Sequence, residues 1–217
     1  MTPQTVAVVD YGMGNLRSVS KAVEHVAAGR AVVRVTDDGQ EIENADRVVF
    51  PGQGAMRDCM AELGAHGLLR PMRECLGAKP VLGICMGLQV LFDSSEEDPD
   101  TPGFGWLAGR SVRFPSGATD RQGRRLKVPH MGWNRVHQRL DHPLWLGIDD
   151  AERFYFVHSY YVRPGDEALV AGTSEYGLEF TAAIAGEQLF AVQFHPEKSQ
   201  RAGLALLSNF LAWDGRS

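Results

Sequence analysis

The sequence contains few cysteines and no excess of basic residues. Three cysteines in 217 residues are too few, and an odd number, for a disulfide framework, so a reducing compartment is expected. The net charge of −5 provides no basic face of the kind that nucleic-acid binding requires. We therefore expect no nucleic-acid partner.

Long apolar stretches are also missing. No run approaches the ~20 residues of a membrane-spanning helix, so no membrane association is expected. The apolar residues 6–9 follow the N-terminus without a basic segment or a cleavage site, which makes the cytoplasm the expected location. No repeat, low-complexity tract or linker divides the chain. A single domain over residues 1–217 is the expectation.

Apolar runs instead alternate with amphipathic segments over the first part of the chain. This alternation predicts an α/β fold with an open, mostly parallel sheet flanked by helices. The predicted strands are residues 5–10, 31–35, 47–50 and 81–84, and the predicted helices are residues 16–26, 56–63 and 68–76.

Strand-like pieces dominate after residue 110 and predict a small appended antiparallel sheet. They lie at residues 111–114, 126–128 and 134–136, followed by one long aromatic strand at residues 153–162. Further strands are expected at residues 169–173, 180–185 and 188–194, the last two joined as a hairpin, before a C-terminal helix around residues 204–211.

Cys85 occupies the most informative turn in the chain. Gly83 and Gly87 flank it at two residues on either side, directly after an apolar strand. This Gly-x-Cys-x-Gly pattern is the sulfur counterpart of the nucleophile elbow, where glycines let strand and helix backbones approach. Leu88 and Leu91 predict that a helix follows. A buried structural cysteine is the alternative, and the paired glycines favour the nucleophile.

A nucleophilic cysteine needs a base and a group that orients the base. Among the seven histidines, His195 precedes Pro196 and Glu197. Because residues i and i+2 of an extended chain point to the same side, Glu197 can lie beside the His195 imidazole. A Cys85-His195-Glu197 triad for acyl transfer is therefore the hypothesis, with a surface His-Pro-Glu turn as its alternative.

Two glycine-containing turns follow predicted strands. The segment Pro51-Gly-Gln-Gly-Ala55 would share a sheet edge with Cys85, so Gly52 could donate a backbone N–H to an oxyanion together with Met86. An ordinary loop remains an open alternative there. The turn at residues 11–15 lacks the third glycine of a dinucleotide fingerprint, which favours a purely structural turn.

These motifs resemble a known family. Gly83-Ile-Cys-Met-Gly-Leu-Gln89, His195-Pro-Glu197 and Pro51-Gly-Gln-Gly-Ala55 are similar to the triad and oxyanion loop of the class I glutamine amidotransferases, which have a flavodoxin-like fold. Within that class, Asp10-Tyr-Gly-Met-Gly-Asn15 and Pro129-His-Met-Gly-Trp-Asn134 resemble the glutaminase subunits of imidazole glycerol phosphate synthase, as do Phe156-Val-His-Ser-Tyr160 and His195-Pro-Glu-Lys-Ser199.

The resemblance implies roles for individual residues. Cys85, His195 and Glu197 would be catalytic, and Gly52 and Met86 would form the oxyanion hole. Glutamine would be held by Gln89, Glu97, Ser159 and Tyr160. Asn15, Trp133, Tyr155 and Lys198 would face a (β/α)₈-barrel cyclase subunit in a heterodimer that uses neither cofactor nor metal.

Other functions can be weighed against this one. A glutaminase of another pathway is disfavoured by the Pro129–Asn134 motif. A stand-alone Cys-dependent γ-glutamyl hydrolase would be fully active without a partner. A non-catalytic binding subunit is disfavoured because Cys85, His195 and Glu197 are all present.

Overall fold

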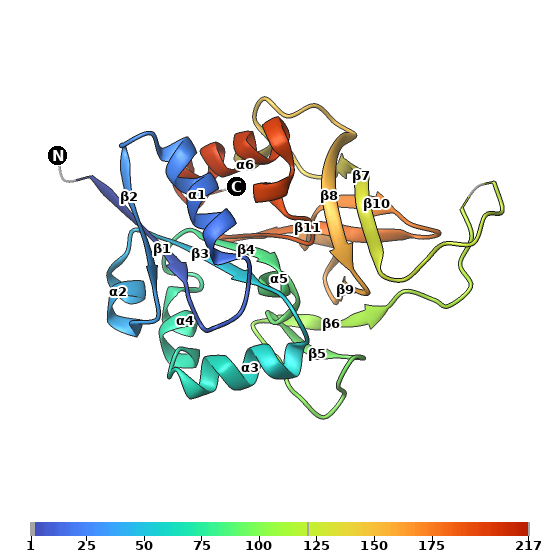
Figure 1. Ribbon diagram of the computed structural model, residues 1–217, viewed down its shortest axis with the longest axis horizontal. Helices are drawn as coiled ribbons and strands as arrows, with labels where there is room; N and C mark the ends of the chain where they lie inside the picture. The colour runs from blue at the N-terminus through green and yellow to red at the C-terminus, as the bar shows by residue number, and fades with distance from the viewer. Residues whose placement is uncertain (1–2, 121, 217) are drawn as a thin grey trace.

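A nine-stranded sheet forms the centre of the computed structural model, which describes residues 3–120 and 122–216 (Figure 1). The strand order is β2-β1-β3-β4-β12-β11-β10-β7-β8. Pairing is parallel from β2 to β12 and antiparallel from β12 to β8. The strands are β1 Gln4–Val9, β2 Ala31–Thr36, β3 Arg47–Gly52, β4 Val81–Cys85, β7 His130–Gln138, β8 Glu152–His158, β10 Val170–Glu175, β11 Glu179–Gly186 and β12 Leu189–Val192.

Helices cover both faces of the parallel half, which explains why its strands are apolar on both sides. Figure 1 shows α1 (Leu16–Ala27) and α6 (Gln200–Ala212) on one face, and α2 (Gly39–Asn44), α3 (Met56–Ala65) and α4 (Leu69–Cys75) on the other. Alternate residues of β1 divide accordingly, with Val8 in the α1–α6 core and Val9 in the core beneath α2–α4. None of the described helices is long and apolar enough to cross a membrane.

A second, three-stranded sheet lies beside the antiparallel half. It consists of β5 (Phe92–Ser95), β6 (Leu107–Arg113) and β9 (Tyr160–Pro164), with β6 in the middle. β5 pairs parallel to β6, and β9 pairs antiparallel to it. The predicted α/β fold with a small additional sheet is confirmed, although this sheet is mixed and the predicted strand around residues 134–136 extends the large sheet instead.

Short 3₁₀ turns complete the elements: η1 Pro143–Trp145, η2 Glu167–Leu169 and η3 Pro196–Lys198.

Three local predictions were wrong. Residues 153–162 form two strands, β8 and β9, in different sheets, with the change of sheet at Ser159. Residues 126–128 form a loop, where the Tyr176 hydroxyl donates to the Lys127 carbonyl at 2.7 Å. A helix does follow Cys85, but α5 spans only Met86–Gln89 and stops short of Leu91. The Val90 carbonyl accepts from the Phe104 N–H, and the Leu91 carbonyl accepts from the N–H groups of Trp106 and Leu107, where the chain turns into β5.

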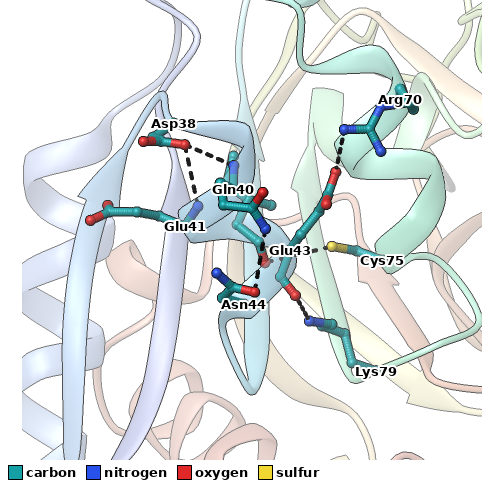
Figure 2. Close-up of polar contacts among 9 residues, drawn as sticks. Asp38, Gln40, Glu41, Glu43, Asn44, Arg70, Cys75 and Lys79 are labelled. Carbon is teal, nitrogen blue, oxygen red and sulfur yellow. Dashed lines mark hydrogen bonds and ion pairs between the residues drawn. The ribbon is translucent and has the colours of Figure 1, made fainter.

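Helix α2 was not predicted, because a helix is recognised by apolar residues that recur every three or four positions, and its six residues include a single buried apolar side chain, Ile42. Polar contacts fix it at both ends (Figure 2). Asp38 caps its start by accepting backbone N–H bonds from Gln40 and Glu41. At its end the Lys79 ammonium donates to the carbonyls of Glu43 and Ala45, at 2.5 and 2.7 Å. The positive charge of Lys79 also interacts favourably with the negative end of the helix dipole. Because Lys79 lies two positions before β4, these bonds connect α2 to that strand.

Candidate active site

Cys85 lies at the end of β4, where the chain turns into α5. Its backbone has φ 57° and ψ −105°, a left-handed conformation that L-residues rarely adopt. The turn is also very tight: a Cβ at Gly87 would lie 1.9 Å from the Phe50 carbonyl oxygen, and one at Gly83 would lie 2.7 Å from the Gly87 oxygen. The predicted sharp turn is confirmed, and both flanking positions require glycine.

The loop after β3 lies directly beside this turn. Gly52 is in register with Cys85 across the parallel pair β3–β4. A Cβ at Gly52 would approach Met86 Cβ to 2.7 Å and Tyr11 Oη to 2.5 Å, so the loop packs closely against the start of α5. Tyr11, fully buried, donates its hydroxyl to the Pro51 carbonyl at 2.9 Å. The turn at residues 11–15 therefore supports the Gly52 loop from behind.

His195 and Glu197 are held together after β12, the strand next to β4 in the sheet. The His195 Nδ1 and Glu197 Oε1 atoms are 2.9 Å apart, and the Glu197 side chain is fully enclosed. Burial acts to lower the pKa of His195, but the neighbouring Cys85 and the Glu197 carboxylate raise it to about 9. The imidazolium form is thereby favoured, and this is the form that can protonate a leaving group.

The histidine backbone is fixed as well as its ring. The His195 N–H donates to the Tyr155 carbonyl on β8 at 2.9 Å. The Ser199 hydroxyl donates to the His195 carbonyl at 2.6 Å and accepts from the Tyr155 N–H at 3.0 Å. The position of the base therefore depends on β8, far from Cys85 in the strand order.

A cleft of about 530 Å³ opens over these residues. Eight of the predicted site residues border it: Cys85, Met86, Gln89, Glu97, Ser159, Tyr160, His195 and Lys198. Glu197 lies behind His195, and Gly52 lies beside Cys85, next to Gln53 and Gly54 on the cleft wall. Glu97 comes from the acidic loop after β5. Its carboxylate accepts the Met56 N–H at 3.3 Å, and burial raises its pKa.

Gln193 is a site residue that sequence reasoning missed. It is fully buried, and its amide nitrogen lies 3.7 Å from Cys85 Sγ. Its amide oxygen accepts from Gln89 Nε2 at 3.1 Å, while Gln89 Oε1 accepts from the Ser111 hydroxyl. Gln193 lies two residues before His195, just as Glu197 lies two residues after it. In an extended segment residues i and i+2 point to the same side, so this spacing could have predicted Gln193 as a site residue.

Three of the residues expected to face a partner form one cluster. The Trp133 and Tyr155 rings are edge-to-face at 6.0 Å, and the Lys198 ammonium lies 6.0 Å from the Tyr155 ring centroid. Trp133 is 38% exposed, and its neighbour Met131 is 63% exposed. Asn15 stands apart from these contacts, immediately before α1. An exposed aromatic and methionine pair of this kind is typical of an interface.

The family model described as "Glutamine amidotransferase class-I" matches residues 7–213. The chain belongs to the class I glutamine amidotransferases. Among similar proteins, the imidazole glycerol phosphate synthase subunit HisH of Thiobacillus denitrificans is 60% identical over 210 residues, covering 96% of this chain and 91% of the relative. HisH of Aromatoleum aromaticum is 59% identical over 211 residues, covering 96% and 98%. Within the class, the chain therefore belongs to the HisH family.

Solved structures show the same amidotransferase fold at low identity. PurLQS from Thermotoga maritima superposes with a TM-score of 0.68 at 17% identity, covering 97% of this chain and 99% of that one. A glutamine amidotransferase from the same organism has a TM-score of 0.62 at 16% identity, with coverage of 93% and 80%. Within residues 3–120 and 122–216 of this amidotransferase, no group of three His, Cys, Asp or Glu side chains is placed to hold a metal ion.

The buried histidines of the amidotransferase predict how its stability depends on pH. Burial lowers the pKa of His130 and His142 to about 4 and that of His158 to about 3. In the unfolded chain these histidines have a pKa of ~6.5, so below this pH they bind protons in the unfolded state but stay neutral in the folded state. The free energy of unfolding should therefore fall between pH 6.5 and 5, with a slope approaching ~1.4 kcal/mol per pH unit for each histidine.

His195 acts in the opposite direction. Because its folded pKa is raised, it stabilises the fold fully below pH ~6.5, and this contribution is lost as pH rises through about 9. Urea unfolding curves from pH 5 to 9.5 should therefore give a stability maximum near pH 6.5. A free energy that stays constant from pH 6.5 to 5 would contradict the assignment of neutral buried histidines.

Proposed function

We propose that the chain is the glutaminase subunit of an imidazole glycerol phosphate synthase in histidine biosynthesis. It hydrolyses glutamine to glutamate and ammonia, and a (β/α)₈-barrel cyclase subunit uses that ammonia to make imidazole glycerol phosphate and AICAR. The supporting observation is the cleft in which a strained Cys85 meets the His195–Glu197 pair. The subunit is proposed to be one cytoplasmic amidotransferase domain over residues 1–217, and three free cysteines are consistent with that compartment.

The proposed chemistry is amide hydrolysis through a thioester. The Cys85 sulfur attacks the glutamine carboxamide carbon, and the backbone N–H groups of Gly52 and Met86 stabilise the oxyanion. His195 donates a proton to the departing nitrogen as the C–N bond breaks, which releases ammonia. Water then attacks the thioester with His195 as base, and glutamate leaves as Cys85 is regenerated. Glu197 orients the ring and stabilises its charge.

Glutamine is proposed to lie between Cys85 and the wall of the cleft opposite. Glu97 supplies a carboxylate at the cleft for the substrate's ammonium group, and Ser159 and Tyr160 supply backbone polar groups. Gln89 borders the cleft, and its side-chain amide nitrogen donates to the Tyr160 carbonyl and to the Gln193 amide oxygen. Its role is therefore to set the shape of the wall as well as to contact the substrate.

A partner is required because ammonia released into water at neutral pH is mostly protonated and is no longer nucleophilic. The proposed heterodimer places the cyclase against Asn15, Trp133, Tyr155 and Lys198. Lys198 borders the cleft and also contacts the Tyr155 ring, so the proposed interface adjoins the site of ammonia release. The Gly52–Gln53 loop is the proposed element that a bound cyclase switches.

The isolated subunit should hydrolyse glutamine slowly, and the cyclase with its nucleotide-like ligand should raise the rate by orders of magnitude. Glutamate release measured for the subunit alone, with the cyclase, and with the cyclase plus ligand tests this. High activity without the partner, especially on other γ-glutamyl substrates, would favour a stand-alone γ-glutamyl hydrolase.

A further inference from the structure

Two buried histidines that the proposed chemistry does not use lie directly opposite each other on β7 and β8. His130 and His158 are register partners across this antiparallel pair, and they are 3% and 5% exposed. His130 Nδ1 and His158 Nε2 are 2.9 Å apart. His158 Nδ1 is 2.8 Å from the Tyr160 carbonyl oxygen, and His130 Nε2 is 3.3 Å from the Asn134 amide nitrogen.

The partners determine where the protons are. A carbonyl oxygen only accepts, so His158 Nδ1 carries a hydrogen and, in the neutral ring, His158 Nε2 accepts. His130 Nδ1 must then donate, which leaves His130 Nε2 to accept from Asn134 Nδ2. The Asn134 amide is itself oriented, because Nδ2 also donates to the Glu175 carbonyl at 2.8 Å and Oδ1 accepts from the Arg135 N–H at 2.9 Å. The chain runs in one direction from Asn134 to Tyr160.

This chain ends on the wall of the glutamine cleft. The Tyr160 carbonyl that accepts from His158 also accepts from Gln89 Nε2 at 3.3 Å, and His158, Ser159 and Tyr160 all border the cleft. Burial lowers the pKa of His158 to about 3, and the positive charge of His195, which borders the same cleft, disfavours a second cation as well. A neutral, fully bonded His158 holds the wall without repelling the catalytic imidazolium.

We propose that His130 is a positioning residue that fixes the His158–Tyr160 wall of the glutamine cleft through the bond from its Nδ1–H to His158. The inference rests on the proposed function and names a determinant of substrate binding within it. Packing alone does not account for this pair. His130 is stacked between Tyr176 and Phe156 at 4.1 and 4.9 Å, an environment that a phenylalanine would fill without burying polar atoms.

The same strand connects this wall to the proposed interface. Successive β7 residues point to opposite faces, so His130 and Asn134 point inward, while Met131 and Trp133 are exposed. His130 also borders a second hollow of about 350 Å³, which is shared with Met131, Trp133 and Asn134. A partner bound to Met131 and Trp133 therefore contacts the strand that sets the wall of the glutamine cleft.

Two variants separate hydrogen bonding from bulk. In His130→Asn the short side-chain amide occupies the place of Nδ1 and can still donate to His158. In His130→Gln the amide reaches the place of Nε2 and leaves His158 Nε2 without its donor. With the cyclase and its ligand present, we expect the KM for glutamine to rise about tenfold in His130→Gln. The kcat should stay within about twofold of wild type, because the displaced wall weakens binding of the substrate and of the transition state equally. His130→Asn should keep KM within about twofold.

Nitrogen-15 NMR of histidine-labelled wild-type protein tests the chain without any activity measurement. Both His130 and His158 should give the neutral Nδ1–H tautomer from pH 8 down to pH 5. An Nε2–H tautomer for His130, an unchanged KM in His130→Gln, or equal KM values in the two variants would each overturn the inference. Absence of partner-stimulated glutaminase activity in wild type would instead refute the proposed function, and the tautomers would still be measurable. Melting temperatures of both variants control for loss of fold.

Discussion

Cys85→Ala is expected to abolish glutamine hydrolysis, with a loss of at least about 10⁴-fold in kcat, because no other thiol can form the thioester. The complex with the cyclase should still make product from added ammonium salt at a rate within about twofold of wild type. Glutamine-dependent and ammonia-dependent synthesis, measured on the same reconstituted complex, separate the two expectations. Alanine removes only the sulfur, so the strained backbone at this position and its register with Gly52 should persist.

Cys75→Ala is the matched control, because Cys75 is also a free and buried cysteine. It lies in α4, and its thiol points at the Ile42 carbonyl, 3.7 Å away, under α2. Burial raises the pKa of this thiol, which makes it a poor nucleophile. Glutaminase activity should survive this change. Loss of ammonia-dependent synthesis in Cys85→Ala would show that the division of labour between the two subunits is wrong.

The parts of the site that the sequence predicted are those encoded by short spacing. Two glycines within five residues predict the turn at Cys85. Both are required, because the Phe50 carbonyl oxygen occupies the space of a Cβ at Gly87 and the Gly87 carbonyl oxygen occupies that of a Cβ at Gly83. The His195–Glu197 contact follows from i, i+2 geometry in an extended segment. The parallel half of the sheet was predictable for a similar reason, since its strands are continuous apolar runs between amphipathic helices.

The parts that were missed depend on pairings distant in the sequence. The strand at residues 153–162 had to be divided at Ser159, because Tyr160 pairs with Arg113 in the second sheet while His158 pairs with His130 in the first. Nothing local to that stretch marks the change of sheet. The hydrogen-bonded chain from Asn134 to Tyr160 exists only once β7 and β8 are paired. Similarly, Tyr11 supports the Gly52 loop from 40 residues away along the chain.

The backbone of β8 connects the proposed partner surface with the proposed catalytic base, His195. Its N–H is bonded to the carbonyl of Tyr155, whose ring contacts Trp133 and Lys198. A displacement of β8 at the proposed interface would therefore move the base relative to Cys85. Proton transfer requires distances within hydrogen-bond reach, so small shifts of this strand are sufficient to change the rate. A bound partner would thus act on the proposed base through backbone contacts, whereas the charge of His195 depends on Cys85 and Glu197.

Glu197→Gln should lower kcat by about 10⁴-fold with little change in the KM for glutamine, by analogy with the loss of the orienting carboxylate in serine protease triads. Glutamine is nearly isosteric, but it carries no charge to stabilise the imidazolium. Its amide N–H, if turned toward Nδ1, also forces the ring hydrogen onto Nε2, on the side of Cys85. Because Glu197 contributes to the pKa of about 9, removing its charge should move the pH dependence of kcat to lower pH.

Glu97→Gln provides the contrasting case, because it neutralises a carboxylate that borders the same cleft but does not contact His195. Its main effect should be a higher KM, with the pH dependence of kcat unchanged. Steady-state kinetics of both variants across pH 6 to 10, in the presence of the cyclase and its ligand, distinguish orientation of the base from binding of the substrate. A Glu197→Gln enzyme with wild-type kcat and an unshifted pH profile would mean that the 2.9 Å contact is structural and that another group orients His195.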